Sequence, residues 1–400
     1  MTRDARLRVL TLARNYPNPV LPTLGIWTER LTQSILPYAE PRVIAPVPWA
    51  PPGVPIEAFR RFRSVPSTRR AHDIDINHPR VLTGPGYLLH RFDAALWYPA
   101  IRRVADRLHR ERAFDLIHAH FVYPDGVIAA RLGRRFGIPV VVTEQAPWMP
   151  WLGNYPAVAR QVRNALPAVS LILPVSASLE RNVRSALPDQ DLRSRVVNNL
   201  VDERVFVAPA PTESRDADRL LFVGVVRHVK GLDVLVRALA LLAPNHPAMR
   251  LLVVGSAYYR AYARDEAQVR ALIRELGLDA RVDFAGHASP DEVARYMRTS
   301  AMLVVPSRRE TFSAVTAEAL ASGTPVVATR CGGPEEVLTN GLGKLVPVED
   351  PQALAAGIAE VHQTLPQYDP ATLRASVLSR FGMHAVGDRL QQVYHEVLKR

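Results

Sequence analysis

The sequence predicts an α/β protein built from two doubly wound domains. Its 400 residues exceed what one ordinary hydrophobic core holds, so we expect two domains, each with its own interior. Short apolar, β-branched runs alternate with helix-like segments, which is typical of parallel sheets covered by helices. The alternation occurs in two series, and the polar, Pro-containing stretch 206–218 between them is the expected linker.

The first series supplies the strands of the first domain. Between the third and fourth strands, residues 125–137 have the pattern of a helix. The expected strands are 7–13, 41–47, 115–121, 138–144 and 169–176.

Residues 48–112 do not fit this alternation. Their last part predicts a helix with one apolar side and arginines opposite, which is either a half-buried surface helix or a helix lying on a membrane. We favour the half-buried helix. Its apolar side is formed by Leu96, Ile101, Val104 and Leu108.

The second series supplies the second domain. Helices are expected at 231–243 and 265–277, and another helix closes the chain at 384–400. In such sheets ligands bind beyond the carboxyl ends of the strands, where the strand order reverses, and two facing domains would form a cleft. The expected strands are 219–225, 249–255, 281–286, 301–307 and 324–330.

The net charge of +12 is concentrated in the first half of the chain. Residues 1–200 hold 27 Arg, no Lys and 15 acidic residues, whereas residues 201–400 hold 23 basic and 23 acidic residues. This imbalance indicates an anionic partner such as a membrane surface, a nucleic acid or a phosphate-bearing substrate. The alternative is an arginine-rich composition without a specific role. No basic motif interleaved with aromatic residues supports a nucleic-acid role.

Several classes of protein are disfavoured by simple counts. The single cysteine, Cys331, excludes an intramolecular disulfide and a cysteine-based zinc cluster, and it fits a reducing cytoplasm. We expect no signal peptide at the N-terminus, and no uninterrupted apolar stretch approaches the roughly 20 residues that span a bilayer.

A candidate anion site follows the first strand of the second domain. Gly224 ends the strand, Arg227 and Lys230 follow, and Gly231 precedes a helix whose N-terminus favours anions. An arginine grips phosphate oxygens in pairs, and a lysine adds a compact charge. The alternative is two solvated cations in an ordinary loop. The stretch is neither a Walker loop nor a dinucleotide fingerprint, which disfavours a nicotinamide oxidoreductase.

In the stretch 307–333, two glutamates lie near the start of a predicted helix. Ser313 is the expected N-cap of a helix that ends near Ser322, with Gly323 just beyond it. Glu310 precedes the helix and Glu318 lies more than one turn into it, so they are not a simple surface pair. A carboxylate is suited to binding vicinal hydroxyls, so one could hold a hexose and the other a ribose. The alternative is two solvated glutamates.

Two further patterns concern backbone approach and metal binding. Gly332 and Gly333 follow the next strand, where backbone N–H groups could approach a ligand closely. We expect His118 and His120 to point to opposite faces of their strand and therefore not to share a metal ion. His120, at the strand end, is then expected to face the cleft, and His118 to be structural.

Together these motifs resemble the retaining glycosyltransferases of the GT-B, family-four type, over nearly the whole chain. The resemblance rests on Gly224, on Arg227-x-x-Lys230-Gly231, on P-S-x-x-E-x7-E and on the segment SGTPVVATRCGGPEE. The first half looks closest to teichuronic acid and exopolysaccharide transferases. The resemblance implies two Rossmann-like domains around an interdomain cleft. Residues 1–205 would bind the acceptor, residues 206–380 the nucleotide-sugar donor, and the helix at 381–400 would return to the N-terminal domain.

The resemblance also implies a role for each motif. Arg227 and Lys230 would bind the donor diphosphate and stabilise the departing phosphate in place of Mg²⁺, so no metal or cofactor is expected. Glu310 would hold the donor sugar and Glu318 the ribose. The other implied donor-site residues are Thr311, Phe312 and Ser313 at the sugar, Gly224 and Gly25 at the diphosphate, and Gly286 and His287 at the nucleobase.

The chain departs from the family pattern at three positions. Gln145 stands where relatives commonly carry His, and the adjacent Glu144 has no implied role, so both remain tentative cleft residues with His120. Leu200 replaces a frequent Gly. Ser313 also stands where Gly is common.

The expected function is therefore metal-independent, retaining transfer of a hexose from a nucleotide-diphosphate sugar to a glycan or polyprenyl-linked acceptor in cell-surface polysaccharide synthesis. The protein is expected in the cytoplasm, with peripheral attachment to the anionic inner membrane face through its basic half. The alternatives are a non-hydrolysing nucleotide-sugar epimerase and a non-catalytic nucleotide-sugar binder. The sequence fixes neither sugar, base, acceptor, linkage nor oligomeric state.

Overall fold

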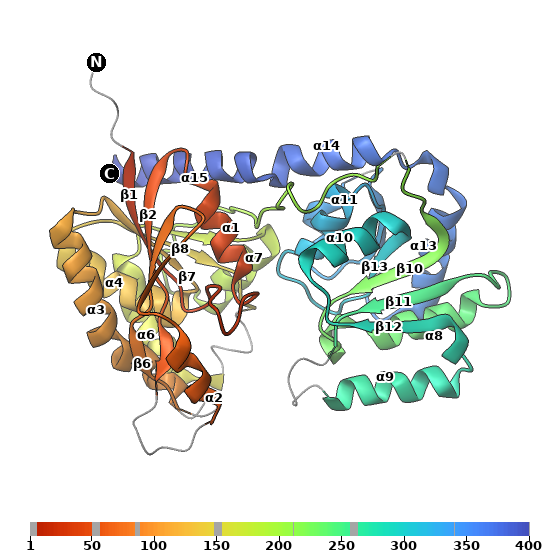
Figure 1. Cartoon of the computed structure of the whole chain (residues 1–400), viewed down its shortest axis with the longest axis horizontal. Coiled ribbons are helices and arrows are strands. Elements are labelled where there is room, and N and C mark those ends of the chain that lie inside the picture. The colour runs from red at the N-terminus through yellow and green to blue at the C-terminus, as the bar shows by residue number, and fades with distance from the viewer. Residues whose placement is uncertain are drawn as a thin grey trace. The chain divides into compact units, whose positions relative to one another are not determined.

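The chain forms two compact units in the computed structural model. The structure describes residues 6–49, 57–84, 89–147, 154–210, 212–256, 263–339 and 341–399. Unit 1 comprises Met1–Leu200 together with Val386–Arg400, and unit 2 comprises Val201–Ala385. The last helix of the chain thus completes the unit that the first strand begins (Figure 1).

Unit 1 is built on a seven-stranded sheet with the order β4-β5-β2-β1-β7-β8-β9. All neighbouring strands are parallel except β4 and β5, which form an antiparallel pair at one edge. The strands are β1 (Leu7–Leu12), β2 (Ala39–Ile44), β4 (Thr68–Ala71), β5 (Ile74–Asn77), β7 (Leu116–His120), β8 (Val140–Glu144) and β9 (Leu171–Pro174). A separate two-stranded sheet pairs β3 (Val47–Trp49) with β6 (Arg80–Leu82).

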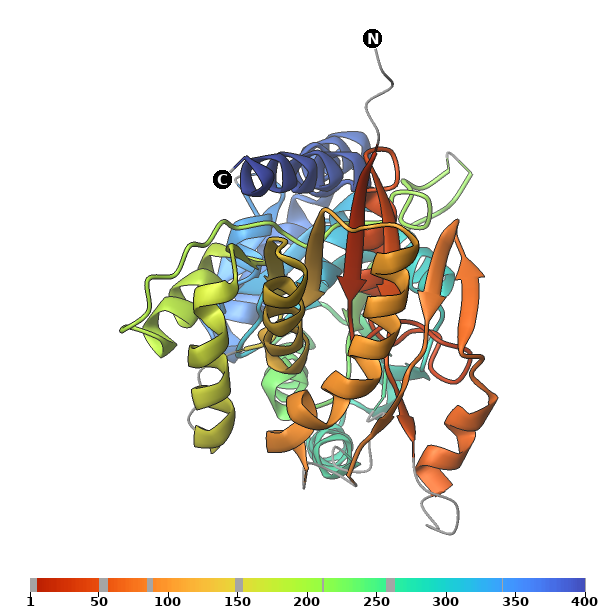
Figure 2. The same cartoon turned by 90° about the vertical axis from the view of Figure 1, so that its left-hand side faces the viewer.

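Helices cover the sheet of unit 1. Figure 2 shows α3, α4 and α6 in front of the strands. The C-terminal helix α15 packs so closely on α1 that a Cβ at Gly387 would lie 2.4 Å from the Ser34 carbonyl oxygen. The helices are α1 (Ile26–Ser34), α2 (Glu57–Arg60), α3 (Asp93–Glu111), α4 (Val127–Phe136), α6 (Pro156–Ala165), α7 (Ala177–Ala186) and α15 (Met383–Leu398).

Unit 2 contains a fully parallel six-stranded sheet with the order β12-β11-β10-β13-β14-β15. Its strands are β10 (Asp216–Val223), β11 (Arg250–Val254), β12 (Val282–Gly286), β13 (Ser300–Val305), β14 (Val326–Thr329) and β15 (Gly343–Val346). Its helices are α8 (Leu232–Leu242), α9 (Ala263–Glu275), α10 (Pro290–Thr299), α11 (Ala314–Ala321), α12 (Pro334–Val337), α13 (Pro351–Gln363) and α14 (Pro370–Phe381).

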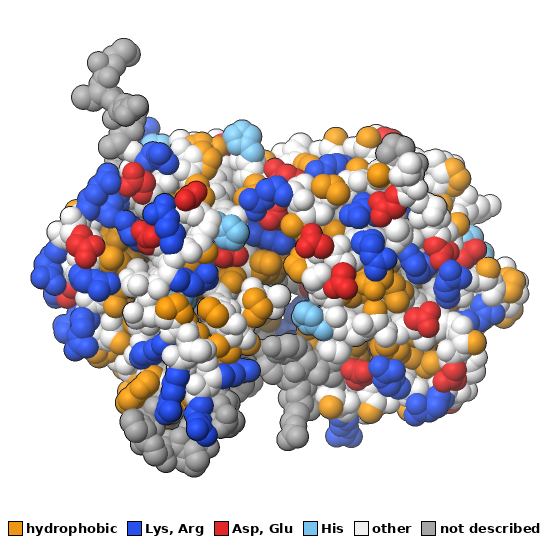
Figure 3. Space-filling model, viewed as in Figure 1, with side chains coloured by type: hydrophobic (Ala, Val, Ile, Leu, Met, Phe, Trp, Pro, Cys, Tyr) orange, Lys and Arg blue, Asp and Glu red, His pale blue; other side chains and the backbone are white. Residues whose placement is uncertain are grey.

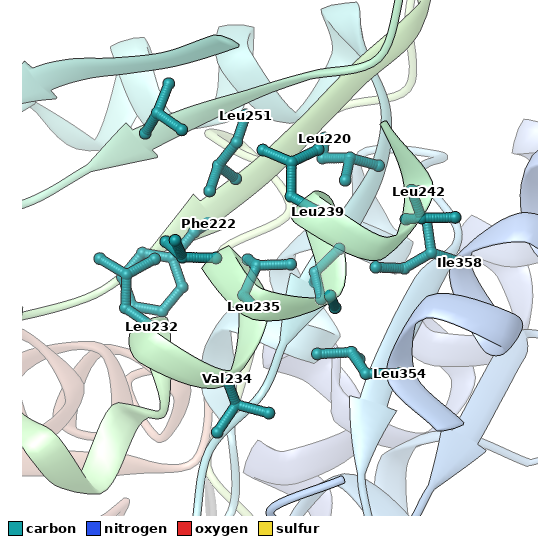
Figure 4. Close-up of a cluster of buried hydrophobic side chains, with 14 of the residues drawn as sticks. Leu220, Phe222, Leu232, Val234, Leu235, Leu239, Leu242, Leu251, Leu354 and Ile358 are labelled. Carbon is teal, nitrogen blue, oxygen red and sulfur yellow. The ribbon is translucent and has the colours of Figure 1, made fainter. Parts of the chain in front are cut away.

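The core of unit 2 explains why α8 is apolar almost all round. Four of its five leucines, all but Leu241, lie between side chains from the sheet, such as Phe222 and Leu251, and Ile358 of α13 (Figure 4). Leu235 is fully buried in this cluster. A helix packed on two sides needs apolar residues on both.

Truncating this core should cost unit 2 much of its stability. We expect Leu235→Ala to lower the free energy of unfolding by about 2–5 kcal/mol, because it removes buried methyl groups and leaves a cavity. Leu241 lies on the same helix but is 47% exposed, so Leu241→Ala should change it by no more than about 0.5 kcal/mol. Denaturant unfolding of both variants checks this, and equal losses would contradict it.

The region 48–112 is more regular than the sequence predicts. Its described residues include the end of β3, the β4–β5 hairpin and β6, and Asp73 and Asp75 belong to that hairpin. The predicted amphipathic helix is α3, with Ile101 and Leu108 buried, but Leu96 is 37% exposed, so its assignment to the buried side was wrong. The buried side of α3 runs through Trp97, Ile101 and Leu108, and Leu96 lies on a different face of the helix, because successive residues of a helix are rotated by about 100°.

Candidate functional site

The strand order of unit 2 reverses next to β10. From β10 the chain proceeds to β11 and β12 on one side, and then returns to β13, β14 and β15 on the other. The loops that follow β10 and β13 therefore leave the same edge of the sheet in opposite directions, which is where ligands of such sheets bind. The first loop carries Arg227 and Lys230, and the second carries Glu310.

The loop after β10 ends at a glycine that no other residue could replace without displacement. Gly231 adopts a left-handed conformation (φ +68°) as the N-cap of α8, and a Cβ there would lie 1.9 Å from the Pro306 carbonyl oxygen. The loops after β10 and β13 are therefore in backbone contact at this point. The turn just before Gly231, His228–Lys230, is a single turn of 3-10 helix, and the His228 N–H donates to Asp265 at 2.8 Å.

The two loops also meet through an ion pair. Lys230 Nζ lies 2.7 Å from Glu310 Oε1, and the same oxygen accepts a hydrogen bond from Ser307 Oγ at 2.8 Å. The Glu310 side chain is only 10% exposed and that of Lys230 is 27% exposed. The structure thus brings together two of the predicted site residues, 80 positions apart, and Glu310 is not the solvated carboxylate of the alternative interpretation.

Of the two glycines after β14, Gly333 contacts the main chain around Glu310, whereas the Gly332 N–H donates to Glu335. The Glu310 N–H donates to the Cys331 carbonyl at 3.1 Å, and the Gly333 N–H donates to the Glu310 carbonyl at 3.2 Å. A Cβ at Gly333 would lie 2.4 Å from the Phe312 backbone. The backbone that Gly333 approaches closely is therefore that of the 310–312 loop, which fixes the Glu310 main chain.

Arg308 is a site-building residue that sequence reasoning missed. Its guanidinium makes two hydrogen bonds of 2.9 Å to the Asp233 carboxylate and a third of 2.9 Å to Glu349, and it also donates to the His228 carbonyl at 2.6 Å. Burial opposes ionisation of Asp233, but the bonds and charge of Arg308 outweigh it and hold the pKa of Asp233 below its usual range. Arg308 therefore joins the loop after β13 to two residues that bracket Lys230 in sequence, His228 before it and Asp233 after it.

The helix after Glu310 begins where predicted but is capped differently. α11 follows Ser313, yet Ser313 is left-handed (φ +66°) and makes no side-chain cap; its hydroxyl instead shares a hydrogen bond with Thr316. The predicted cap was wrong because a capping residue needs extended backbone. At its end, Gly323 takes the predicted left-handed conformation (φ +73°). Glu318 is buried at 7% exposure within this helix.

The remaining predicted donor-site residues of unit 2 fall into two groups. Thr311 and Phe312 follow Glu310, and the Phe312 ring is buried against Phe381 at 5.3 Å between centroids. Gly224 and Gly286 meet at the ends of β10 and β12 through Gly255. The Gly255 N–H donates to the Gly286 carbonyl at 2.6 Å, and a Cβ at Gly255 would lie 2.1 Å from the Gly224 oxygen. His287, next along the chain, is exposed.

Unit 1 has an equivalent reversal of strand order between β1 and β7. Gly25 ends the loop after β1 in a left-handed conformation (φ +70°), and a Cβ there would lie 2.1 Å from the Asn15 oxygen. The same loop is joined to the loop after β7, because the Arg14 N–H donates to Asp125 Oδ2 at 3.2 Å. Asp125 is fully buried, and its other oxygen has no partner among the described residues.

The two histidines of β7 correct a prediction. His118 and His120 lie on the same face of the strand, with ring centroids 4.6 Å apart, because residues two positions apart in a strand point the same way. His118 is structural as predicted: its nitrogens bond to Tyr394 Oη of α15 and Thr143 Oγ1, both at 2.7 Å. Burial lowers the pKa of His118 to about 3, so it is neutral. His120 is also buried, and its Nδ1 has no hydrogen-bond partner within the described part of the chain.

The Glu144 carboxylate has a local structural role. One oxygen accepts the Val122 N–H at 2.9 Å, and the other accepts the N–H groups of Gln145 and Ala146 at 2.8 and 2.7 Å. These bonds tie β8 to the loop after β7. The Gln145 side-chain nitrogen is buried and, among the described residues, unpartnered. Gly25, His120, Glu144 and Gln145 all belong to unit 1.

Asp125 should make stability depend on pH. Burial raises its pKa to about 7, against the attraction of Arg14 and with the repulsion of Asp93 and Glu144. Between about pH 4 and 7 the unfolded chain therefore releases a proton that the folded chain keeps, so stability falls as pH rises through this window and levels off above it. Between pH 5 and 8, the free energy of unfolding should therefore fall by up to roughly 3 kcal/mol less in Asp125→Asn than in the parent chain.

Denaturant unfolding at several pH values measures this effect. The exposed Asp189 of the same unit provides the control, since Asp189→Asn should leave the pH dependence as it is in the parent chain. Parallel pH profiles for Asp125→Asn and the parent chain would contradict the prediction.

Two family models match the chain. The model described as glycosyl transferases group 1 covers residues 208–367, and the model described as Glycosyltransferase Family 4 covers residues 53–205. A D-inositol 3-phosphate glycosyltransferase from Frankia alni is 33% identical over 340 residues, which is 76% of this chain and 80% of that protein. An N-acetyl-alpha-D-glucosaminyl L-malate synthase from Bacillus anthracis is 26% identical over 82% of this chain and 84% of that protein.

Solved structures share the fold. Sucrose-phosphate synthase from Thermosynechococcus elongatus superposes with a TM-score of 0.77 at 19% identity, covering 98% of this chain and 100% of that one. The Anabaena protein HepE in complex with UDP gives a TM-score of 0.73 at 18% identity over 98% of this chain and 100% of its own. Within the described residues, no helix combines the length and apolar character that crossing a bilayer requires.

Proposed function

Since the chain belongs to the group 1, family 4 glycosyltransferases, with the two Rossmann-like domains of the GT-B fold, we propose a specific transfer reaction for it. The enzyme moves a hexose from a nucleotide-diphosphate sugar to a phosphate-bearing glycan or lipid-linked acceptor, with retention at the anomeric carbon. The acceptor serves cell-surface polysaccharide assembly. HepE, which shares the fold, has been crystallised with UDP-glucose, so a nucleotide-sugar donor fits this architecture.

The observation that carries this proposal is the Lys230–Glu310 pair at the strand-order reversal of unit 2. A cation and a carboxylate in contact suit two adjacent parts of one donor, the cation its diphosphate and the carboxylate its sugar. Lys230 and Arg227 bind the diphosphate and stabilise the negative charge that grows as it departs. Glu310 accepts hydrogen bonds from the sugar hydroxyls.

The reaction then needs no separate base on the protein. The acceptor hydroxyl attacks the anomeric carbon on the face from which the phosphate leaves. The bond to the phosphate oxygen breaks as the new glycosidic bond forms, and the leaving phosphate takes the hydroxyl proton. Glu318, buried in α11, holds the ribose hydroxyls in this proposal, and Gly286 and His287 border the nucleobase.

A second candidate acceptor is a small phosphate ester. The relatives include enzymes named D-inositol 3-phosphate glycosyltransferase, and residues 1–200, the bulk of unit 1, carry 12 more basic than acidic residues, which suits either phosphate-bearing acceptor. A lipid-linked acceptor would place the enzyme peripherally at the inner membrane face, in a salt-sensitive manner.

A donor screen followed by an acceptor screen tests the proposal. Thermal shifts with UDP-, GDP- and ADP-sugars identify the donor, and turnover is then compared between D-inositol 3-phosphate and a polyprenyl diphosphate-linked saccharide. The proton NMR coupling at the new anomeric centre reports retention. An epimerised donor formed without any acceptor, or nucleotide binding without turnover on any acceptor, would reject the proposal in favour of an epimerase or a binder.

We further expect transfer to be independent of divalent metal ions, because the cations at 227 and 230 serve the diphosphate. Activity should then persist within about twofold after treatment with EDTA. Assays in EDTA, and in EDTA with excess Mg²⁺ or Mn²⁺, check this. A loss of activity that an added metal restores would contradict it.

A further inference from the structure

Unit 1 carries a cluster of exposed apolar side chains at one end. Among the described residues, unit 1 has five large apolar side chains that are exposed, and four of them are Trp49, Leu82, Phe92 and Leu96, with exposures of 37–45%. We call these four the apolar patch. An exposed apolar cluster of this kind marks an interaction surface more often than a scattered single residue does.

Short connections hold the patch residues together. Trp49 and Leu82 are direct neighbours in the β3–β6 pair. The Leu82 carbonyl accepts a 3.0 Å hydrogen bond from Trp97 Nε1, which fixes the first turns of α3 beside β6. Phe92 is the N-cap residue of α3 and Leu96 lies one helical turn further on, so the two are close neighbours at the start of that helix.

Arginines border the patch. Arg63 and Trp49 line the same small hollow, and the Arg91 guanidinium lies 4.9 Å from the centre of the Phe92 ring. Arg61 and Arg63 are exposed on the turn beside β3. The acidic neighbour Asp93 does not offset them, because it is buried and its carboxylate lies 2.9 Å from His90 Nδ1. Figure 3 shows basic and apolar side chains side by side at the lower end of unit 1.

We propose that this patch and its arginines dock unit 1 onto a bilayer surface that contains anionic lipid. Trp and Phe favour the interfacial layer of a bilayer, and arginine stems extend along apolar surface while the guanidinium binds lipid phosphate. A second copy of the chain fits less well, because it would set one arginine-rich surface against another. The inference deepens the proposed function, since it gives the lipid-linked acceptor a docking surface on the acceptor unit.

Sedimentation of the full chain with vesicles tests the proposal. We expect binding to phosphatidylcholine vesicles that contain phosphatidylglycerol, and much weaker binding to phosphatidylcholine alone. Phe92→Ser with Leu96→Ser should weaken binding at least about tenfold. Leu241→Ser, an equally exposed apolar position in unit 2, should leave binding unchanged.

Arginine variants test the electrostatic part. Arg63→Gln with Arg91→Gln should weaken binding about 30-fold, which corresponds to about 1 kcal/mol for each charge near an anionic surface. Arg264→Gln with Arg274→Gln, exposed on α9 of unit 2, provides the matched control. Equal binding to both vesicle types, or equal binding by patch and control variants, would overturn the proposal.

The remaining outcomes are also distinguishable. Sedimentation velocity without vesicles detects self-association; if the patch variants only abolish that, the patch is a protein interface and the proposal fails. The vesicle assay uses no donor, whereas donor binding and turnover without lipid test the proposed function. The docking proposal and the proposed function can therefore fail independently of each other.

Discussion

Replacing Lys230 with alanine should reduce transfer at least about 10²–10³-fold while the fold survives. The physical reason is that Lys230 supplies a positive charge at the helix start of α8, where the departing diphosphate would develop its negative charge. The charge is partly shielded from water, since the Lys230 side chain is 27% exposed and lies 2.7 Å from Glu310. An interaction that strengthens as charge develops acts on kcat more than on donor affinity.

Initial rates at saturating donor, with donor affinity measured by calorimetry, check this result. Lys344→Ala is the matched control, because Lys344 pairs with Glu360 at 2.7 Å in the same unit but on an exposed surface. Thermal unfolding of both variants shows whether the fold is intact. Near-parental kcat in Lys230→Ala would reject the catalytic role.

Glu310 should be nearly as important, and its two substitutions should differ. Glu310→Ala should reduce turnover at least about 10²-fold, since it removes a charged acceptor of sugar hydroxyls and leaves Lys230 without its partner. Glu310→Gln keeps one oxygen in the place that Ser307 Oγ and Lys230 Nζ contact but removes the charge, so we expect an intermediate loss.

The double variant tests the pair itself. If Lys230 and Glu310 act as a unit, combining Lys230→Ala with Glu310→Ala should cost clearly less than the product of the two single losses. Glu360→Gln, which removes the exposed partner of Lys344, should leave turnover unchanged. Multiplicative losses in the double variant would show that the contact seen here has no catalytic significance.

Local chemistry explains what the sequence could predict. The helix at 314–321 is bounded by a glycine whose left-handed conformation ends it, and the loop from Gly224 to Gly231 combines a strand end, two cations and a helix start. These signals lie within a few residues of one another, so spacing alone predicts the elements. The same holds for the alternating strands and helices that carry the parallel sheets.

Contacts between residues far apart in the chain explain what the sequence could not predict. Arg308 reaches Asp233 and Glu349, which lie 75 residues before and 41 residues after it, because β13 is placed beside β10 rather than at an edge. Nothing in the sequence around Arg308 indicates these two ion pairs. The left-handed Ser313 was missed for a different reason, since serine ordinarily caps a helix from extended backbone. The strands β3 and β6 are only three residues long and offer no period to detect.

The placement of α15 has a consequence for the order in which the protein is made. The ribosome completes all of unit 2 before it reaches Tyr394, whose hydroxyl closes the hydrogen bond to the buried His118 of β7. Until then, the growing chain holds the first sheet without the helix that covers Ser34 and His118. Unit 2 is continuous in sequence and can mature first. A nonsense mutation just after residue 385 would therefore spare the later-made unit and damage the one whose synthesis began first.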